Sequence, residues 1–189
     1  MSTTILLIRH AYTGIPERRQ KPESGLSKIG RIQAEKLAKR IANNYKLEVV
    51  YSSFYKRARE TAEIIAEPHH AEVRETESLN EIGVWTSPTQ LHSPKISPAE
   101  YKEELKILAA AQEKAVDFLK EVAEHHSDET IAVVTHGNMI RGIIAEALVA
   151  GVETVVRLKV NNASLSILEY DDKGEFFRLL LFNDTSHLA

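Results

Sequence analysis

The chain has 189 residues, of which 43% are hydrophobic and 27% are charged, and its formal net charge is −3. These values are typical of one globular domain over residues 1–189, and the net negative charge argues against nucleic acid or acidic membranes as partners. The chain contains no cysteine, which excludes disulfides and cysteine-based zinc sites. The apolar run from Ile5 to Ile8 is too short for a membrane span and has no leader-like flank. We therefore expect a cytoplasmic protein.

Short apolar runs alternate with segments of helical periodicity along the chain. Residues 12–26 have loop composition, and residues 83–98 contain three prolines and form an expected excursion over the rim of a sheet. The other segments are predicted, in chain order, as a strand at 5–8, a helix at 27–43, a strand at 48–51, a helix at 57–66, an edge strand at 71–75, a helix at 98–125, a strand at 130–134, a helix at 138–149 and a hairpin of strands 164–170 and 175–182. This order predicts an α/β fold, a three-layer α/β/α sandwich with a mostly parallel central sheet.

Basic side chains and histidines follow three of the predicted strands. The first strand ends on Arg9 and His10, the strand at 130–134 leads to His136, and the strand at 48–51 leads to a basic cluster that includes Arg57. Ligands of parallel sheets bind beyond the carboxyl ends of the strands. The three strand ends therefore predict an anion site at one rim, and the histidines add the capacity for chemistry.

The helix expected after His136 strengthens this prediction. Gly137 and Asn138 would open it, and the unpaired backbone N–H groups of a helix start bind anions. The alternative is that His136, Gly137 and Asn138 only form a capping turn. A lone histidine at a strand end is likewise more often structural than catalytic, but the pairing of Arg9-His10 with His136 favours function.

Five stretches, in this order along the chain, resemble the motifs of the histidine phosphatase superfamily, the clan of phosphoglycerate mutases and histidine acid phosphatases. They are Leu-Ile-Arg9-His10-Ala, Gly25-Leu-Ser-x-x-Gly30-x-x-Gln33-Ala, Tyr51-Ser-Ser-x-x-Lys-Arg57-Ala-x-x-Thr61-Ala, Leu79-Asn-Glu81 and Val134-Thr-His136-Gly-Asn. The tail Asn183-Asp-x-x-His187-Leu also resembles the tails of small bacterial members. The resemblance covers nearly the whole chain and implies a phosphoglycerate mutase-like fold.

The resemblance also implies roles for individual residues. His10 would be the nucleophile that takes the phosphoryl group as phosphohistidine. Arg9 and Arg57 would donate hydrogen bonds to the phosphoryl oxygens. His136 would complete this cage together with the helix start at Gly137 and Asn138.

Glu81 would act first as the acid that protonates the leaving oxygen and then as the base that activates water. The Leu-Asn-Glu81 context favours it over Glu77, which lies close by in the sequence. The family often continues with Gly-x-Trp-Glu-Gly, whereas here Gly83-Val-Trp85-Thr is shifted and incomplete. Ala11 replaces the usual glycine after the nucleophile, which adds a methyl group but removes no reactive group.

The resemblance implies a metal-independent phosphomonoester hydrolase that needs no cofactor and acts on a small phosphorylated metabolite or a phosphoprotein. The first alternative is a mutase, an isomerase on the same scaffold. The loop after Ala11 lacks the Glu-Ser-x-Trp-Asn continuation typical of mutases, and the rim or cap segment at about 83–104 is short. The second alternative is a non-catalytic phosphate-binding module, which the presence of all the proposed site residues disfavours. The pattern specifies no oligomeric state.

Overall fold

The fold is a sheet of six strands with two helices on each face, as described by a computed structural model for residues 2–82 and 97–189. Three of its strand pairs are parallel, β3–β2, β2–β4 and β4–β1, whereas β1–β5 and β5–β6 are antiparallel. The strands are β1 (Ser2–Arg9), β2 (Val49–Ser53), β3 (Glu72–Thr76), β4 (Thr130–Thr135), β5 (Leu165–Asp171) and β6 (Phe176–Asp184), in the order β3-β2-β4-β1-β5-β6. The predicted parallel sheet with a terminal hairpin is thereby confirmed.

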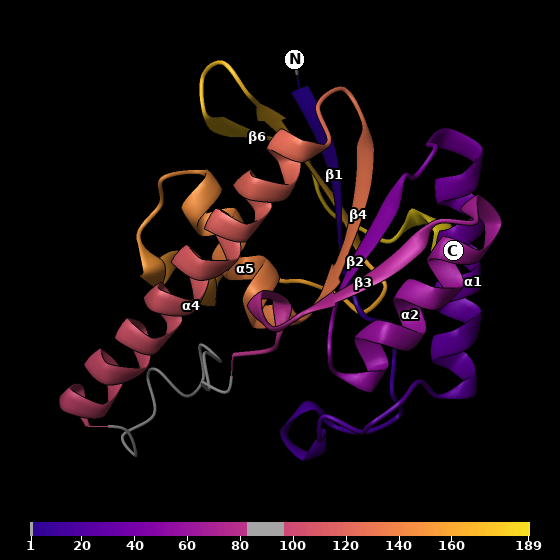
Figure 1. Ribbon diagram of the computed structural model, residues 1–189. Coiled ribbons are helices and arrows are strands. Elements are labelled where there is room, and N and C mark those ends of the chain that lie inside the picture. Colours follow the sequence, from indigo (N-terminus) through magenta and orange to yellow (C-terminus); the bar gives the residue numbers. More distant parts are fainter. Residues whose placement is uncertain (1, 83–96) are drawn as a thin grey trace.

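Helices form a layer on each side of this sheet (Figure 1). One layer consists of α1 (Lys28–Asn44) and α2 (Lys56–Ala66), and the other of α4 (Pro98–His125) and α5 (Gly137–Ala147). Short 3₁₀ turns lie between these elements, namely η1 (Glu17–Arg19), η2 (Glu67–His69), η3 (Glu77–Leu79) and η4 (Val152–Arg157), and another, η5 (Ser186–Leu188), follows β6. The three-layer sandwich follows the prediction. The predicted excursion lies outside the described residues over 83–96.

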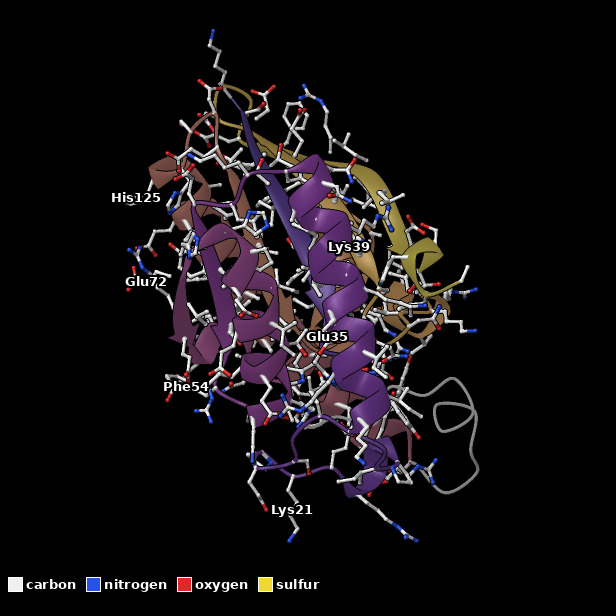
Figure 2. All side chains as sticks on the ribbon, turned by 90° about the vertical axis from the view of Figure 1, so that its right-hand side faces the viewer. Lys21, Glu35, Lys39, Phe54, Glu72 and His125 are labelled. Carbon is white, nitrogen blue, oxygen red and sulfur yellow. The ribbon has the colours of Figure 1, made fainter. Side chains whose placement is uncertain are left out.

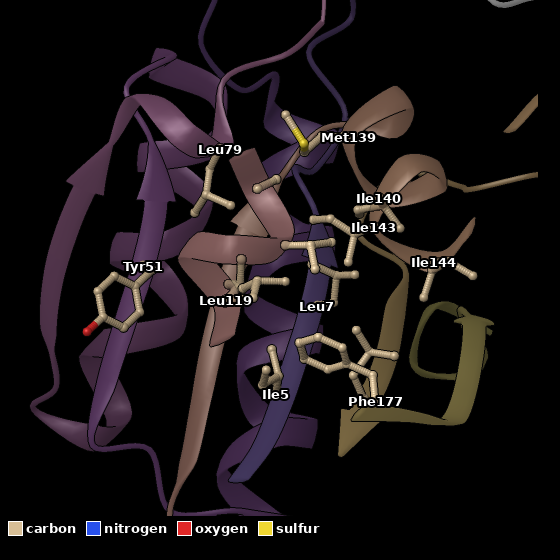
Figure 3. Close-up of a cluster of buried hydrophobic side chains, with 14 of the residues drawn as sticks. Ile5, Leu7, Tyr51, Leu79, Leu119, Met139, Ile140, Ile143, Ile144 and Phe177 are labelled. Carbon is tan, nitrogen blue, oxygen red and sulfur yellow. The ribbon is translucent and has the colours of Figure 1, made fainter. Parts of the chain in front are cut away.

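The central strand β1 shows why the sheet is buried on both faces. Ile5 and Leu7 pack against α4 and α5, whereas the alternate residues Leu6 and Ile8 pack against α1 and α2. Figure 3 shows the first of these two clusters, with Ile5 and Leu7 near Leu119 of α4. A strand covered on both faces needs apolar side chains at every position, which explains the continuous apolar run in the sequence.

The helices that cover the sheet are amphipathic. In α1 the side chains of Leu37 and Ile41 are buried, whereas Glu35 and Lys39 project into solvent (Figure 2). Ser27 begins this helix, because its Oγ accepts a hydrogen bond from the backbone N–H of Gly30 at 3.1 Å. Among the described helices, none combines the length and apolarity that a membrane crossing requires.

Candidate active site

The register of β1 on β4 brings the two predicted histidines together. Arg9 pairs with Thr135, and both are the last residues of their strands, so His10 and His136 follow side by side. The backbone N–H of His10 donates to the carbonyl of Thr135 at 2.9 Å, and the two imidazole centroids lie 5.1 Å apart. Both histidines are buried, with exposed fractions of 1% and 0%.

One hydrogen bond determines which nitrogen of His10 carries its proton. The Nδ1 atom lies 2.9 Å from the carbonyl oxygen of Ala11, which can only accept, so Nδ1 is the protonated nitrogen. The Nε2 atom then keeps its lone pair and accepts a hydrogen bond from Nε of Arg57 at 3.2 Å. The imidazole is therefore held in the tautomer that presents Nε2 as a nucleophile.

Two distant segments fix the backbone turn that carries His10. The carbonyl of His10 accepts from Nδ2 of Asn162 at 3.0 Å and from the backbone N–H of Ala163 at 3.3 Å. The next N–H, that of Ala11, donates to Oγ1 of Thr61 on α2 at 3.1 Å. These bonds anchor the turn from both sides and leave the imidazole little freedom to move.

Arg57 lies in the first turn of α2, directly beyond the end of β2, as the sequence predicted. Its side chain is buried between the imidazole of His10 and the 12–26 loop, where Nη1 donates to the carbonyl of Lys21 at 3.1 Å. The guanidinium carbon lies 5.0 Å from the ring centroid of Tyr55, over its face. Lys21 and Phe54 mark this end of the molecule in Figure 2, opposite His125.

Arg9 is buried beside the start of α5, with 7% of its surface exposed. Its Nη1 donates to the carbonyl of Val160 at 2.6 Å, and its Nη2 pairs with the carboxylate of Glu17. A Cβ built on Gly137 would lie 3.3 Å from Cζ of Arg9, so the glycine is what allows this close packing. The Nε–H of Arg9 is buried and has no hydrogen-bond partner among the described residues.

His136 is oriented by a short network of side chains. Oγ of Ser53 lies 3.0 Å from Oδ1 of Asn80, an oxygen that also accepts from the backbone N–H of Phe54 at 3.1 Å. The hydroxyl of Ser53 therefore donates its single hydrogen bond to Oδ1 of Asn80. Nε2 of His136 lies 2.8 Å from Oγ of Ser53 and must donate to that oxygen. The remaining nitrogen, Nδ1, is buried and has no partner within the described residues.

Glu81 is carried to the same site by a contact between η3 and β4. The hydroxyl of Thr135 donates to the carbonyl of Leu79 at 2.6 Å, which anchors the segment that leads to Glu81. The carboxylate then lies at the start of α5: its Oε1 accepts from the N–H of Ile82 at 3.1 Å, and its Oε2 lies 3.5 Å from the N–H of Asn138. The structure thus places Asn138 beside the proposed acid.

Burial and the nearby arginines shift the pKa values of the three titratable groups. Burial lowers the pKa of His10 well below its ordinary value, and the charges of Arg9 and Arg57 lower it further. The pKa of His136 is lowered well below its ordinary value mainly by burial. Burial raises the pKa of Glu81, although Arg9 acts in the opposite direction. Both histidines are therefore neutral, and Glu81 retains its proton to a higher pH than an exposed glutamate.

The site includes residues that the sequence analysis did not identify. Ser53 and Asn80 orient His136, Asn162 holds the His10 turn, and Glu17 pairs with Arg9. Ser53 and Asn80 lie within stretches that resemble family motifs, which was the only sequence signal for them. Arg141, whose Nη1 donates to Oδ1 of Asn138 at 3.1 Å, could have been found from helical spacing, because it lies three residues after Asn138 on the same face of α5.

Nothing in the described part of the chain groups three or more histidine, aspartate or glutamate side chains as a metal site would. The cationic groups at the strand ends are instead the guanidinium groups of Arg9 and Arg57, donors that suit phosphate oxygens. The arrangement can therefore bind a phosphoryl group, attack it with Nε2 of His10 and supply a proton from Glu81.

The sequence resembles those of several known proteins. It is 29% identical to phosphoglycerate mutase-like protein 4 of Arabidopsis thaliana over 97% of this chain and 86% of that protein. It is also 29% identical to the metal-independent phosphoserine phosphatase of Arabidopsis thaliana, over 99% of this chain and 84% of that protein.

The fold resembles that of solved structures. The phosphoserine phosphatase of Entamoeba histolytica, crystallised as a mutant with phosphoserine, superposes with a TM-score of 0.77 at 22% identity, over 99% of this chain and 100% of that one. Residues 5–185 match the histidine phosphatase superfamily (branch 1). That match spans both histidine strand ends and all or most of each strand of the sheet, and the chain therefore belongs to the histidine phosphatase superfamily.

Proposed function

We propose that the protein is a phosphomonoester hydrolase that works through a phosphohistidine at Nε2 of His10. One observation carries the proposal: the imidazole of His10 is held by Ala11 in the tautomer whose lone pair lies among Arg9, Arg57 and His136. Phosphoryl transfer needs positioning and charge stabilisation more than covalent assistance, and these groups supply both.

In the first step Nε2 of His10 attacks phosphorus and the bond from phosphorus to the ester oxygen breaks. The guanidinium of Arg57, which donates to Nε2 before substrate binds, transfers its hydrogen bond to a phosphoryl oxygen. Glu81 gives its proton to the departing oxygen, so that an alcohol leaves. The raised pKa of Glu81 keeps that proton available.

In the second step water replaces the alcohol. The Glu81 carboxylate takes a proton from water, the oxygen attacks phosphorus, and the bond from phosphorus to Nε2 breaks. Inorganic phosphate leaves, and His10 and Glu81 return to their starting protonation states. Nδ1 of His10 donates to the carbonyl of Ala11 throughout.

His136 contributes a hydrogen bond that depends on an added proton. Its Nε2–H is already given to Ser53, so Nδ1 can donate to a phosphoryl oxygen only when the ring is an imidazolium. A phosphate dianion beside the ring raises the pKa of His136 and thereby favours protonation of Nδ1. Substrate binding is thus coupled to the charging of His136.

Trapping the intermediate tests this mechanism directly. Glu81→Gln slows the attack of water, whereas p-nitrophenyl phosphate still phosphorylates His10 because its leaving group needs no proton. We expect a denaturant-quenched reaction of this variant to show one acid-labile phosphoryl group by intact-mass spectrometry. EDTA should not change the rate of the wild-type enzyme.

The double variant Glu81→Gln, His10→Ala is the matched control and should stay unlabelled. Label that persists in this double variant, or activity that EDTA abolishes, contradicts the mechanism. Release of inorganic phosphate from 3-phosphoglycerate, measured alongside, separates a phosphatase from the alternative mutase, which would return the phosphoryl group to an isomer.

Arg57 should be the most sensitive of the phosphate-binding side chains, because it contacts the nucleophile itself. We expect Arg57→Ala to lower kcat/KM for p-nitrophenyl phosphate by about 10²–10³-fold, the usual effect of losing one charge-stabilising donor. Arg57→Lys should recover only part of this loss, since an ammonium cannot reproduce the forked contact.

The half-buried neighbour Arg59 offers the control, because its side chain pairs with Glu63 and Glu75 and not with His10. Arg59→Ala should keep nearly full activity. Wild-type kcat/KM in Arg57→Ala would remove that residue from the proposed phosphate cage.

The substrate is proposed to be a small phosphorylated compound, in agreement with the phosphoserine phosphatases among the relatives. The cytoplasmic location expected from the sequence stays a prediction, which fractionation of the cells that produce the protein would check.

A further inference from the structure

Arg141 is a cation at the edge of the site that the proposed phosphoryl transfer does not use. It follows Asn138 by three residues on α5, so the two side chains lie on one face of the helix. Its Nη1 donates to Oδ1 of Asn138 at 3.1 Å. This bond directs the guanidinium back toward the beginning of α5, where His136 and Glu81 lie.

The surroundings of Arg141 are charged and partly closed to water. Its Nε is buried and has no hydrogen-bond partner among the described residues. Burial lowers the pKa of Arg141, the charge of Arg9 acts in the same direction, and the carboxylates of Glu17 and Glu81 oppose them. An arginine nevertheless stays protonated in proteins, so the site keeps a charged donor that the side chains of the described residues do not fully satisfy.

The proposed chemistry determines where the leaving group lies relative to Arg141. In-line attack places the ester oxygen on the side of phosphorus opposite Nε2 of His10, and Glu81 must reach that oxygen to protonate it. The carboxylate of Glu81 lies 3.5 Å from the backbone N–H of Asn138, whose side chain contacts Arg141. The bound leaving group therefore extends past Glu81 and Asn138 toward the guanidinium of Arg141.

We propose that Arg141 is a specificity residue that binds a carboxylate on the leaving group, an inference that rests on the proposed phosphatase function. A carboxylate can accept two N–H donors of one guanidinium and carries the single charge that balances it. A second phosphate would bring two negative charges close to Glu17, and a neutral polyol would offer the guanidinium no negative charge. The preferred substrates are therefore phosphorylated acids whose carboxylate lies a few bonds from the ester oxygen.

A matched pair of substrates tests the proposal. 3-Phosphoglycerate and glycerol 3-phosphate differ in one group, a carboxylate in the first and a hydroxymethyl in the second. We expect the wild-type enzyme to prefer 3-phosphoglycerate, and Arg141→Met to lower its kcat/KM by on the order of 10- to 100-fold, mostly through KM. The value for glycerol 3-phosphate should change by less than about threefold, within the usual effect of a substitution without direct contact.

Arg141→Lys keeps the charge and should restore part of the preference. Arg178→Met is the matched control, because Arg178 pairs with Glu169 and Asp171 on the hairpin at the opposite rim. Equal losses on both substrates in Arg141→Met and in Arg141→Lys would overturn the proposal, and so would a wild-type enzyme without preference or one that prefers a bisphosphate. Hydrolysis of p-nitrophenyl phosphate that depends on His10 reports separately on the phosphatase function.

Discussion

His10→Ala should lose at least about 10³-fold of kcat on p-nitrophenyl phosphate, because the variant has no atom to accept the phosphoryl group. Orthophosphate binding should persist, since Arg9, Arg57 and His136 remain in place and His10 contributes mainly its lone pair. The measurements are steady-state kinetics and titration calorimetry with orthophosphate. Lost turnover with preserved orthophosphate binding indicates a missing nucleophile, whereas loss of both indicates a collapsed pocket.

An exposed histidine provides the control for this variant. His125 lies at the end of α4, where its Nδ1 contacts the carbonyl of Glu121, far from the 12–26 loop (Figure 2). His125→Ala should keep wild-type turnover. If His10→Ala retained a tenth or more of the wild-type kcat, another group would have to be the nucleophile.

Glu81→Gln should separate substrates by their leaving groups. An alkoxide such as that of glycerol 3-phosphate needs a proton to depart, and general acids typically contribute about 10²–10⁴-fold, so kcat/KM should fall by that factor. A nitrophenolate leaves without help, and p-nitrophenyl phosphate should lose less than about 10-fold. The comparison uses kcat/KM, because this ratio excludes the later attack of water, which Glu81 also assists.

The pH profile follows from the same proton. Glu81 acts as an acid only while protonated, and burial raises its pKa, so kcat/KM for glycerol 3-phosphate should fall as the pH rises through that raised value. In Glu81→Gln, the ratio of kcat/KM for glycerol 3-phosphate to kcat/KM for p-nitrophenyl phosphate should no longer decline as the pH rises. Glu77→Gln is the control, because that exposed carboxylate was the alternative acid in the sequence. If Glu81→Gln lowered kcat/KM equally for glycerol 3-phosphate and p-nitrophenyl phosphate, Glu81 would be excluded as the acid.

The sheet and the meeting of His10, His136 and Arg57 could be predicted from the sequence because they depend on local patterns. Apolar runs define the strands, and parallel strands always end at the same rim, so residues that follow the runs must converge. The pairing of Arg9 with Thr135, the last residues of β1 and β4, shows this convergence.

The remaining site residues depend on contacts that local patterns do not encode. Asn162 reaches the carbonyl of His10 across 152 positions of the chain, and Glu17 pairs with Arg9 from an exposed loop without periodicity. The pKa shift of Glu81 could not be derived from the sequence either, since it results from burial at the start of α5. Such features become visible only when the loops and side chains are placed.

The position of β1 in the sheet has a consequence for synthesis on the ribosome. β1 precedes the other strands in the chain, yet its neighbours are β4 and β5, and the His10 turn is held by Asn162 and Ala163. Because domains generally fold as units, we expect β1 to remain unpaired until most of the chain has emerged from the ribosome. The candidate active site is thus among the last parts to be completed, and we expect a nascent chain that ends before Asn162 to have no activity.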